Sequence, residues 1–422
     1  MRIMPIYGTR PEAIKLAPVL RALRGVPGTE VITCVTGQHR EMLDQVNQLF
    51  GIVPDVDLGV MTQGQSLTAL TTAVLQGLEP VLREHKPDWI VVQGDTTTAF
   101  AAGLAAFYQR VPTAHVEAGL RTGNLASPWP EELNRQLAAR IADLHFAPTS
   151  QSRVNLLREG VEGAKVRVTG NTVIDALLQA LDMLRADPAL AAEQAARFPF
   201  LDPTRRLVLV TGHRRENFSG GLDRVCRAIA AIADRGDVQV VYPVHLNPVV
   251  QTAAKMALAG RPNVYLLPPL DYLAFVWMMD RAHLIVTDSG GVQEEAPSLG
   301  KPVLVTRDTT ERPEAVEAGT VRLVGTSPER LVHEVARLLD DNGAYESMAA
   351  AHNPYGDGQA AARIAGWMTG AHATEFLPSP LLFRGEPRPH SPWLAGEEAS
   401  SERVVTSSLQ EHEAAAHAIA AE

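Results

Sequence analysis

Short apolar runs alternate with helical stretches along most of this chain, and this alternation restricts the fold more than any other feature. The runs are bounded by Gly, Pro or Asp, as in short strands that are buried on both faces. Strands separated by helices and short loops pair in parallel. The sequence therefore predicts an α/β fold with doubly wound, Rossmann-like parallel sheets. The expected strands are residues 3–7, 31–35, 89–92, 112–116, 207–210, 238–242, 264–267, 284–287 and 303–306.

The chain is too long, at 422 residues, for one ordinary hydrophobic core. The alternation restarts after Gly170-Asn-Thr172, which predicts one domain over residues 1–169 and a second over 170–355, facing each other across a cleft. From residue 371 the composition becomes Pro-rich and then rich in Ala, Ser and Glu. Such a composition predicts a mobile tail over residues 371–422.

The bulk composition excludes several classes of protein. The 48 acidic residues outnumber the 38 basic ones, which argues against a nucleic-acid partner. Cys34 and Cys226 each lie in an apolar stretch and offer neither a disulfide framework nor a metal ribbon. The first residues lack a signal-peptide core, and no apolar run is long enough to span a bilayer. We therefore expect a soluble cytoplasmic protein with no membrane partner.

Three acidic residues fall at strand ends or helix starts in consecutive units of the first half. Asp95 follows the strand at 89–92, Glu117 follows the strand at 112–116, and Glu131 opens the next helix. In an open parallel sheet these positions share the carboxyl edge, where ligands bind. Neighbouring carboxylates in a closed site can serve as acid and base. The alternative for any one of them is a helix cap.

The stretch 284–297 has the outline of a nucleotide site. A buried strand ends in Ser289-Gly290-Gly291, where a helix begins. Glycines let backbone N–H groups approach a phosphate, and the helix start carries partial positive charge. Because a carboxylate repels a diphosphate, one of Glu294 and Glu295 is expected to accept hydrogen bonds from sugar hydroxyls. The alternative is a strand–helix joint with an acidic capping pair.

The first βα turn adds two cations. Thr9 and Glu12 have the spacing of a capping box, with Arg10 at the helix entrance and Lys15 about one turn further. Both cations are placed to face a bound diphosphate, although an ordinary capped helix with exposed cations gives the same pattern. The turn carries no Walker loop and no Rossmann glycine fingerprint, which argues against a nicotinamide cofactor.

The histidines and acids do not predict a metal site. The 13 histidines lack the spacing of transition-metal ligands. The pair Asp55 and Asp57 resembles the Asp-x-Asp of metal-dependent glycosyltransferases, but it lies beside a proline in a turn-rich segment. His213 follows a buried strand; the adjacent Arg214 and Arg215 should lower its pKa unless an anion binds beside it. A purely structural His213 is the alternative.

With these residues in view, the chain resembles the bacterial non-hydrolysing UDP-N-acetylglucosamine 2-epimerases. The resemblance extends over nearly nine-tenths of the sequence and includes long motifs in one order. The main ones are Gly8-Thr-Arg-Pro-Glu-Ala-Ile-Lys15, Gly94-Asp-Thr-Thr-Thr98, His115-Val-Glu-Ala-Gly-Leu-Arg-Thr-Gly123, Pro130-Glu-Glu-Leu-Asn-Arg135, His213-Arg-Arg-Glu-Asn217, the stretch 288–300, Arg307-Asp-Thr-Thr-Glu-Arg-Pro313 and Asn353-Pro-Tyr-Gly-Asp-Gly358.

The resemblance implies a two-domain fold of the glycogen-phosphorylase (GT-B) type, with a terminal helix at 356–370 returning to the first domain. It implies a homodimer that interconverts UDP-N-acetylglucosamine (UDP-GlcNAc) and UDP-N-acetylmannosamine (UDP-ManNAc) without metal or cofactor. UDP would be eliminated to give 2-acetamidoglucal and then added back. The implied catalytic residues are Asp95, Glu117, Glu131 and His213. The implied substrate-binding residues are Arg10, Lys15, Phe275, Ser289, Gly290, Gly291, Glu295 and Arg312.

Three other functions stay open at this level. A glycosyltransferase of the same fold would share the nucleotide stretch but need an acceptor, and a non-catalytic sensor would need no carboxylates. The substrate could also be a modified UDP-2-acetamido sugar. Two departures from the family pattern concern binding. Leu270 replaces a Gln found near the uracil in some members, and Glu41 and Gly64 stand where activator-binding members have Gln and Arg.

Overall fold

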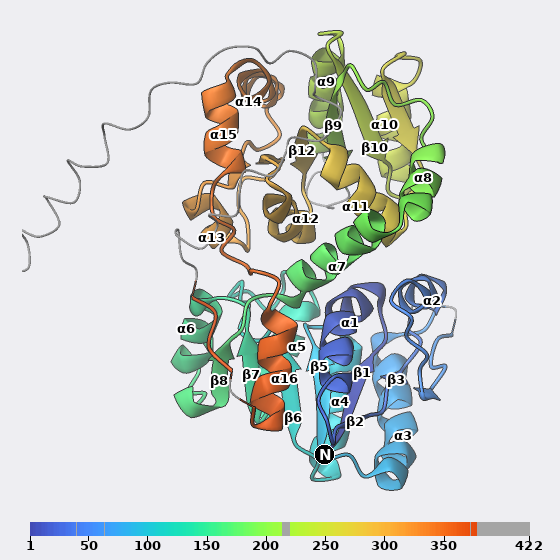
Figure 1. The fold of residues 1–422 in the computed structure, drawn as a ribbon, viewed down its shortest axis with the longest axis vertical. Coiled ribbons are helices and arrows are strands. Elements are labelled where there is room, and N and C mark those ends of the chain that lie inside the picture. Colours follow the sequence, from blue (N-terminus) through green and yellow to red (C-terminus); the bar gives the residue numbers. More distant parts are fainter. Residues whose placement is uncertain (39, 63, 213–219, 372, 378–422) are drawn as a thin grey trace, which may run out of the picture. The chain divides into compact units, whose positions relative to one another are not determined.

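The computed structural model describes residues 1–38, 40–62, 64–212, 220–371 and 373–377. Within these ranges the chain forms two parallel sheets, each flanked by helices (Figure 1). The predicted fold class of two doubly wound α/β sheets is therefore confirmed. No helix in the described ranges is both long and apolar enough to cross a bilayer.

The first sheet has the order β4-β3-β1-β5-β6-β7-β8, and the short β2 also pairs with β1. Every pairing in it is parallel. Its strands are β1 (Arg2–Tyr7), β2 (Glu30–Val31), β3 (Cys34–Val35), β4 (Val56–Asp57), β5 (Trp89–Gln93), β6 (Thr113–Val116), β7 (Leu144–Ala147) and β8 (Val166–Val168). The accompanying helices are α1 (Arg10–Arg24), α2 (Arg40–Leu49), α3 (Leu67–His85), α4 (Thr97–Tyr108), α5 (Glu131–Ile141), α6 (Ser150–Arg158) and the 3₁₀ turn η1 (Gly163–Lys165).

The second sheet has the order β11-β10-β9-β12-β13-β14 and is also parallel throughout. Its strands are β9 (Arg206–Thr211), β10 (Val238–Pro243), β11 (Val264–Leu267), β12 (Leu284–Thr287), β13 (Val303–Val305) and β14 (Val321–Leu323). The helices are α7 (Thr172–Ala186), α8 (Pro188–Ala196), α9 (Gly221–Ala233), α10 (Pro248–Leu258), α11 (Tyr272–Arg281), α12 (Gly290–Glu295), the 3₁₀ turn η3 (Ala296–Leu299), α13 (Pro313–Glu317), α14 (Pro328–Asp340), α15 (Asn342–Ala349) and α16 (Ala360–Thr369).

The strand order reverses once in each sheet, beside β1 in the first and beside β9 in the second. The loops that leave two adjacent strands at such a point diverge to opposite faces and open a crevice at the carboxyl edge. In the first sheet these are the loops after β1 and β5, and in the second the described one is the loop after β12. The predicted binding turns therefore occupy the positions where open α/β sheets bind ligands.

The expected single strand at 31–35 is wrong in detail, because the structure has two short strands there. Between β2 and β3 the backbone N–H of Thr33 donates to the side-chain Oδ2 of Asp55 at 2.7 Å, while the Thr33 carbonyl still accepts from Val56 N–H at 3.1 Å. The segment around Asp55 and Asp57, expected to be turn-rich, contains the two-residue strand β4. The Thr33 N–H thus bonds to a side chain 22 positions away, which no local pattern reveals.

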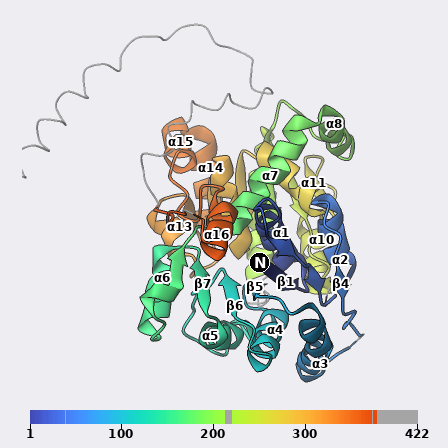
Figure 2. The same ribbon diagram turned by 60° about the horizontal axis from the view of Figure 1, so that its bottom comes forward.

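Helix α16 packs against α1 and α7 (Figure 2). Asp175, in the first turn of α7, accepts hydrogen bonds from the N–H groups of Ala361 and Ala360 at 2.8 and 3.3 Å. This carboxylate therefore caps the start of α16. The domain boundaries at 169/170 and 355/356 stay predictions.

Burial raises the pKa of Asp175 to about 7, against about 3.9 in an unfolded chain. Since the folded protein holds this proton more tightly, its contribution to stability is full below about pH 4 and is lost as pH rises through 7. Between pH 5 and 8 the free energy of unfolding should fall by about 2 kcal/mol more in the wild type than in Asp175→Asn. Denaturant unfolding at both pH values measures this difference.

The matched control for that experiment is Asp182→Asn, an exposed carboxylate on the same helix. It should show the wild-type pH dependence. An Asp175→Asn variant with the same pH dependence as the wild type would contradict the raised pKa.

The first residues of the predicted tail differ from expectation. Phe376 is buried, and its backbone N–H donates to the Val168 carbonyl at the edge of β8 at 2.7 Å. Glu375 forms an ion pair with Arg153 at 3.0 Å. Residues 373–377 therefore belong to the packed structure, and residues 378–422 lie outside the described ranges.

Candidate active site

The turn after β1 is closed by a buried carboxylate. Glu12 accepts hydrogen bonds from the backbone N–H groups of Gly8 and Thr9 at 3.0 and 2.8 Å, which confirms the predicted capping box. Its other oxygen accepts from Thr96 Oγ1, in the loop after β5, at 2.6 Å. A Cβ at Gly8 would lie 2.0 Å from Thr36 Oγ1, so only glycine fits there. These contacts fix the first βα turn against the loop after β5.

Glu117 follows β6 and is held by donors on both carboxylate oxygens. Lys15 Nζ lies 2.5 Å from Oε1, Asn171 Nδ2 donates to Oε1 at 2.9 Å, and Gln93 Nε2 donates to Oε2. The backbone φ of Glu117 is 63°, a strained value for a residue other than glycine. Burial alone would raise the pKa of Glu117, but the Lys15 ammonium, helped by Arg312 and Asn171, holds it below its usual value. Glu117 is thus an ionised and fully partnered carboxylate.

Asp95 and Glu131 reach the same edge of the first sheet from different elements. Because β5 and β6 pair in parallel, Asp95 and Glu117 leave adjacent strands on the same side. Helix α5, which Glu131 opens, is tied to the Asp95 loop by two residues. Arg135 forms an ion pair with Asp95 Oδ2 at 2.6 Å, and Asn134 Nδ2 donates to the Asp95 carbonyl at 2.9 Å. Asp95 and Glu117 thus follow adjacent strands, and the helix that Glu131 opens is held to the Asp95 loop.

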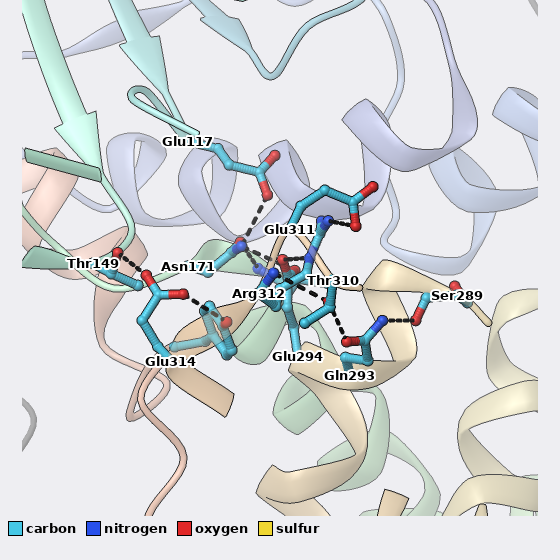
Figure 3. Close-up of polar contacts among 12 residues, drawn as sticks. Glu117, Thr149, Asn171, Ser289, Gln293, Glu294, Thr310, Glu311, Arg312 and Glu314 are labelled. Carbon is cyan, nitrogen blue, oxygen red and sulfur yellow. Dashed lines mark hydrogen bonds and ion pairs between the residues drawn. The ribbon is translucent and has the colours of Figure 1, made fainter. Parts of the chain in front are cut away.

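The loop after β12 carries Ser289, Gly290 and Gly291 into the start of α12. The Arg312 guanidinium lies directly over Gly290, where an added Cβ would meet Cζ at 2.6 Å. Arg312 Nε donates to Glu294 Oε1 at 2.8 Å, which fixes the guanidinium in that place (Figure 3). A cation therefore lies against the predicted phosphate loop, and the absence of a side chain at Gly290 lets it do so.

Glu295, the predicted ribose acceptor, is buried beside an aromatic pair. Tyr272 Oη donates to Glu295 Oε1 at 3.3 Å, and the Tyr272 ring lies 6.2 Å from that of Phe50. Burial raises the pKa of Glu295 to about 7, and Arg10 is among the cations that oppose this rise. Phe275, the predicted uracil contact, is half-buried on α11. Glu295 is thus a buried carboxyl group that accepts a hydrogen bond from an aromatic residue.

Side chains of the two sheets meet through direct hydrogen bonds. Asn171 Nδ2 donates both to Glu117 on the first sheet and to Glu294 on the second, at 2.9 and 3.1 Å. Thr149 Oγ1, after β7, donates to Glu314 on α13 at 2.8 Å. Figure 3 shows both junctions beside Arg312. Asn171 therefore connects Glu117, which follows β6, with Glu294, on the helix that follows the Ser289–Gly291 loop.

His213, with Arg214 and Arg215, lies outside the described residues, so its catalytic role stays a prediction. The roles of the other candidate residues also stay predictions, although their positions are now known. Within the described ranges, no three or more His, Cys, Asp or Glu side chains are grouped so that they could hold a metal ion. Asp55 and Asp57 have protein partners: Asp55 accepts from Thr33, and Asp57 pairs with Arg40 at 2.6 Å.

Sequence reasoning missed Gln93 and Asn171 and left Glu294 without a defined partner. The one available signal was the position of Asn171 before the helix at Thr172, which is typical of a helix cap. That part is correct, since Asn171 Oδ1 accepts from Val173 N–H at 3.0 Å. A capping pattern does not reveal what the amide hydrogens of the same side chain bind.

The sequence and the fold are similar to those of known proteins. The family model described as UDP-N-acetylglucosamine 2-epimerase matches residues 21–369. The UDP-N-acetylglucosamine 2-epimerase of Escherichia coli O157:H7 is 59% identical over 365 residues, covering 86% of this chain and 97% of that protein. The enzyme of the same name from Campylobacter jejuni is 48% identical over 367 residues, covering 86% of this chain and 96% of that protein.

Solved structures agree with this match. The UDP-GlcNAc 2-epimerase of Neisseria meningitidis, solved bound to UDP-GlcNAc, superposes with a TM-score of 0.83 at 48% identity and covers 88% of this chain and 100% of its own. The Methanocaldococcus jannaschii enzyme, solved with UDP-GlcNAc and UDP, gives a TM-score of 0.74 at 34% identity, with 88% and 100% coverage. The predicted GT-B-like fold and the predicted family are thereby confirmed: the chain belongs to the UDP-N-acetylglucosamine 2-epimerase family, and as an epimerase it is an isomerase.

Proposed function

We propose that this enzyme interconverts UDP-GlcNAc and UDP-ManNAc by eliminating UDP and adding it back, without metal or nicotinamide. The family membership supports epimerisation at C2 of UDP-GlcNAc. The observation that carries the mechanistic part is the direct connection between two groups of residues. Glu117 pairs with Lys15 and is joined through Asn171 to Glu294. Glu294 in turn holds Arg312 against the phosphate loop.

The chemical difficulty is the C2–H bond, which beside an amide nitrogen is too weakly acidic for simple deprotonation. Elimination avoids a free carbanion. The C1–O bond to UDP breaks, the C2 proton passes to a carboxylate, and a C1=C2 double bond forms in 2-acetamidoglucal. Re-addition of the UDP oxygen to C1, with a proton delivered to the other face of C2, gives the epimer. Asp95, Glu117 and Glu131 are the candidate proton-transfer groups.

The departing UDP accumulates negative charge on its diphosphate. Fixed positive charges next to the place where charge develops stabilise such a transition state. Lys15 and Arg312 are suitably buried cations, with side chains only 14% and 12% exposed. Arg10, at the start of α1, would add a third positive charge. Glu295 and Phe275 would hold the nucleoside. His213 would assist departure of UDP by donating a proton or a hydrogen bond.

We further propose a cytoplasmic homodimer. Cys34 and Cys226 are buried free thiols, which suit a reducing compartment. The family resemblance is the support for the dimer.

The test is product analysis of UDP-GlcNAc incubated with the purified protein in EDTA and without nicotinamide. We expect UDP-ManNAc to appear at an equilibrium reached from either epimer, with the sugar still bound to UDP. Release of free N-acetylmannosamine and UDP would instead indicate a hydrolytic epimerase. UDP-GlcNAc that binds but does not turn over would point to a modified sugar or to a glycosyltransferase awaiting its acceptor.

A further inference from the structure

Both buried cations of the candidate diphosphate site are paired with carboxylates of this chain. Lys15 Nζ lies 2.5 Å from Glu117 Oε1, and Arg312 Nε lies 2.8 Å from Glu294 Oε1. The carboxylates are even more buried than the cations, at 6% and 0% side-chain exposure. A buried charge is stable only with a partner, so each pair is mutually required while no nucleotide is bound.

Asn171 joins the two pairs into one group. Its amide nitrogen donates one hydrogen bond to Glu117 Oε1 and one to Glu294 Oε2, at 2.9 and 3.1 Å. Its amide oxygen accepts from Val173 N–H, and its backbone N–H donates to the Tyr355 carbonyl at 2.6 Å. The side chain is therefore fixed in one orientation, with both amide hydrogens used on carboxylates from different sheets (Figure 3).

The two carboxylates have different electrostatic surroundings. Burial acts to raise the pKa of both carboxyl groups. For Glu117 the nearby Lys15 ammonium outweighs burial, and the pKa is lowered. For Glu294 burial outweighs the opposing effect of Arg312, and the pKa is raised. The hydrogen bond from Arg312 to Glu294 is as short as those between a guanidinium and an ionised carboxylate. A nucleotide diphosphate that approaches Lys15 and Arg312 thus encounters two cations whose charge is already compensated.

We propose that Glu117, Glu294 and Asn171 form a counter-charge clamp that keeps Lys15 and Arg312 paired in the nucleotide-free enzyme and limits its affinity for the diphosphate. Glu294 and Asn171 are positioning residues, because they act through Arg312, Lys15 and Glu117. The proposal rests on the proposed function, which puts the diphosphate at these cations. For turnover, the clamp would favour release of UDP-linked products, because both cations pair with their carboxylates again as the product leaves.

The clamp makes a prediction opposite to that of a purely structural contact. If Glu294 only supported Arg312, removing its charge would misplace the guanidinium and weaken UDP binding. If Glu294 competes with the diphosphate, Glu294→Gln keeps the shape, removes the repulsion and should bind UDP about tenfold more tightly, equal to about 1.4 kcal/mol. Asn171→Asp adds a third negative charge and should bind UDP about tenfold more weakly.

Calorimetric titration of the full chain with UDP measures all the variants. The matched control is Glu314→Gln, which alters another carboxylate at the junction of the two sheets, bonded to Thr149 and Tyr355 instead of a cation. It should bind UDP within about twofold of the wild type. Should Glu294→Gln fail to fold, Glu117→Gln removes the other half of the clamp and should also tighten UDP binding.

Unchanged or weaker UDP binding by a folded Glu294→Gln would overturn the clamp alone. That result would mean that the charge of Glu294 does not repel the diphosphate, or that Glu294 serves only to hold Arg312 in place. A wild-type protein that does not bind UDP at all would overturn the proposed function together with the clamp. Tighter UDP binding by Glu294→Gln together with weaker UDP binding by Asn171→Asp would support the clamp. Damage to the fold would instead weaken UDP binding by both variants.

Discussion

The Glu117→Gln variant is expected to lose epimerase activity by about a thousandfold while it still folds and binds UDP. General acid–base groups contribute roughly 10²–10⁴-fold to the rate, and glutamine cannot take or give the proton. Glutamine keeps the shape of the side chain, so contacts to Gln93 and Asn171 can partly persist. Initial rates of UDP-GlcNAc conversion, together with UDP titration, separate chemistry from binding.

Two comparisons make this experiment decisive. Asp95→Asn and Glu131→Gln should each also lose activity by orders of magnitude. The surface variant Glu79→Gln, in an exposed ion pair with Arg83 on α3, should retain wild-type rates. Near-full activity in all three of the carboxylate variants would remove those residues from the mechanism.

Gly290→Ala is expected to weaken UDP binding by about a hundredfold with little loss of stability. The new Cβ would lie 2.6 Å from Arg312 Cζ and 2.7 Å from Nη1, so the guanidinium must leave its place over the phosphate loop. The end of a long side chain can move at small cost to the fold, but the loss of a buried cation contact to phosphate costs on the order of 2–3 kcal/mol. UDP titration and thermal unfolding measure the two effects.

Gly291→Ala is the matched comparison for this variant. A Cβ at Gly291 would have its nearest neighbour, Glu295 Oε2, at 3.9 Å, which is ordinary contact distance. It adds the same methyl group to the same loop without moving Arg312, and should lose clearly less affinity. Equal losses of UDP affinity in the two variants would show that the effect of Gly290→Ala does not come from displacing Arg312.

The fold was largely predictable because its determinants are local. Apolar strands and amphipathic helices alternate at spacings that a single sequence displays, and parallel pairing follows from the helices between strands. Parallel pairing also predicts that Asp95 and Glu117 lie at the same edge of the sheet. The capping box of Thr9 and Glu12 was readable for a similar reason, since its residues lie three apart.

What the sequence could not supply are contacts between distant segments. Asn171 bonds to carboxylates 54 and 123 positions away, and nothing in its local pattern distinguishes it from an ordinary helix cap. The Thr33 N–H, between β2 and β3, bonds to the Asp55 side chain, and Phe376 docks on the edge of β8. Each requires the folded arrangement before the partner is known.

The most direct test of the central claim follows the C2 proton. UDP-GlcNAc is incubated with the enzyme in deuterium oxide, without added metal or nicotinamide, and proton NMR follows C2–H. Elimination and re-addition predicts UDP-ManNAc that carries deuterium at C2, with exchange abolished in Glu117→Gln. UDP-ManNAc that forms while fully retaining the original C2 proton would contradict exchange of that proton with solvent through the carboxylates, and with it the mechanism proposed for this site.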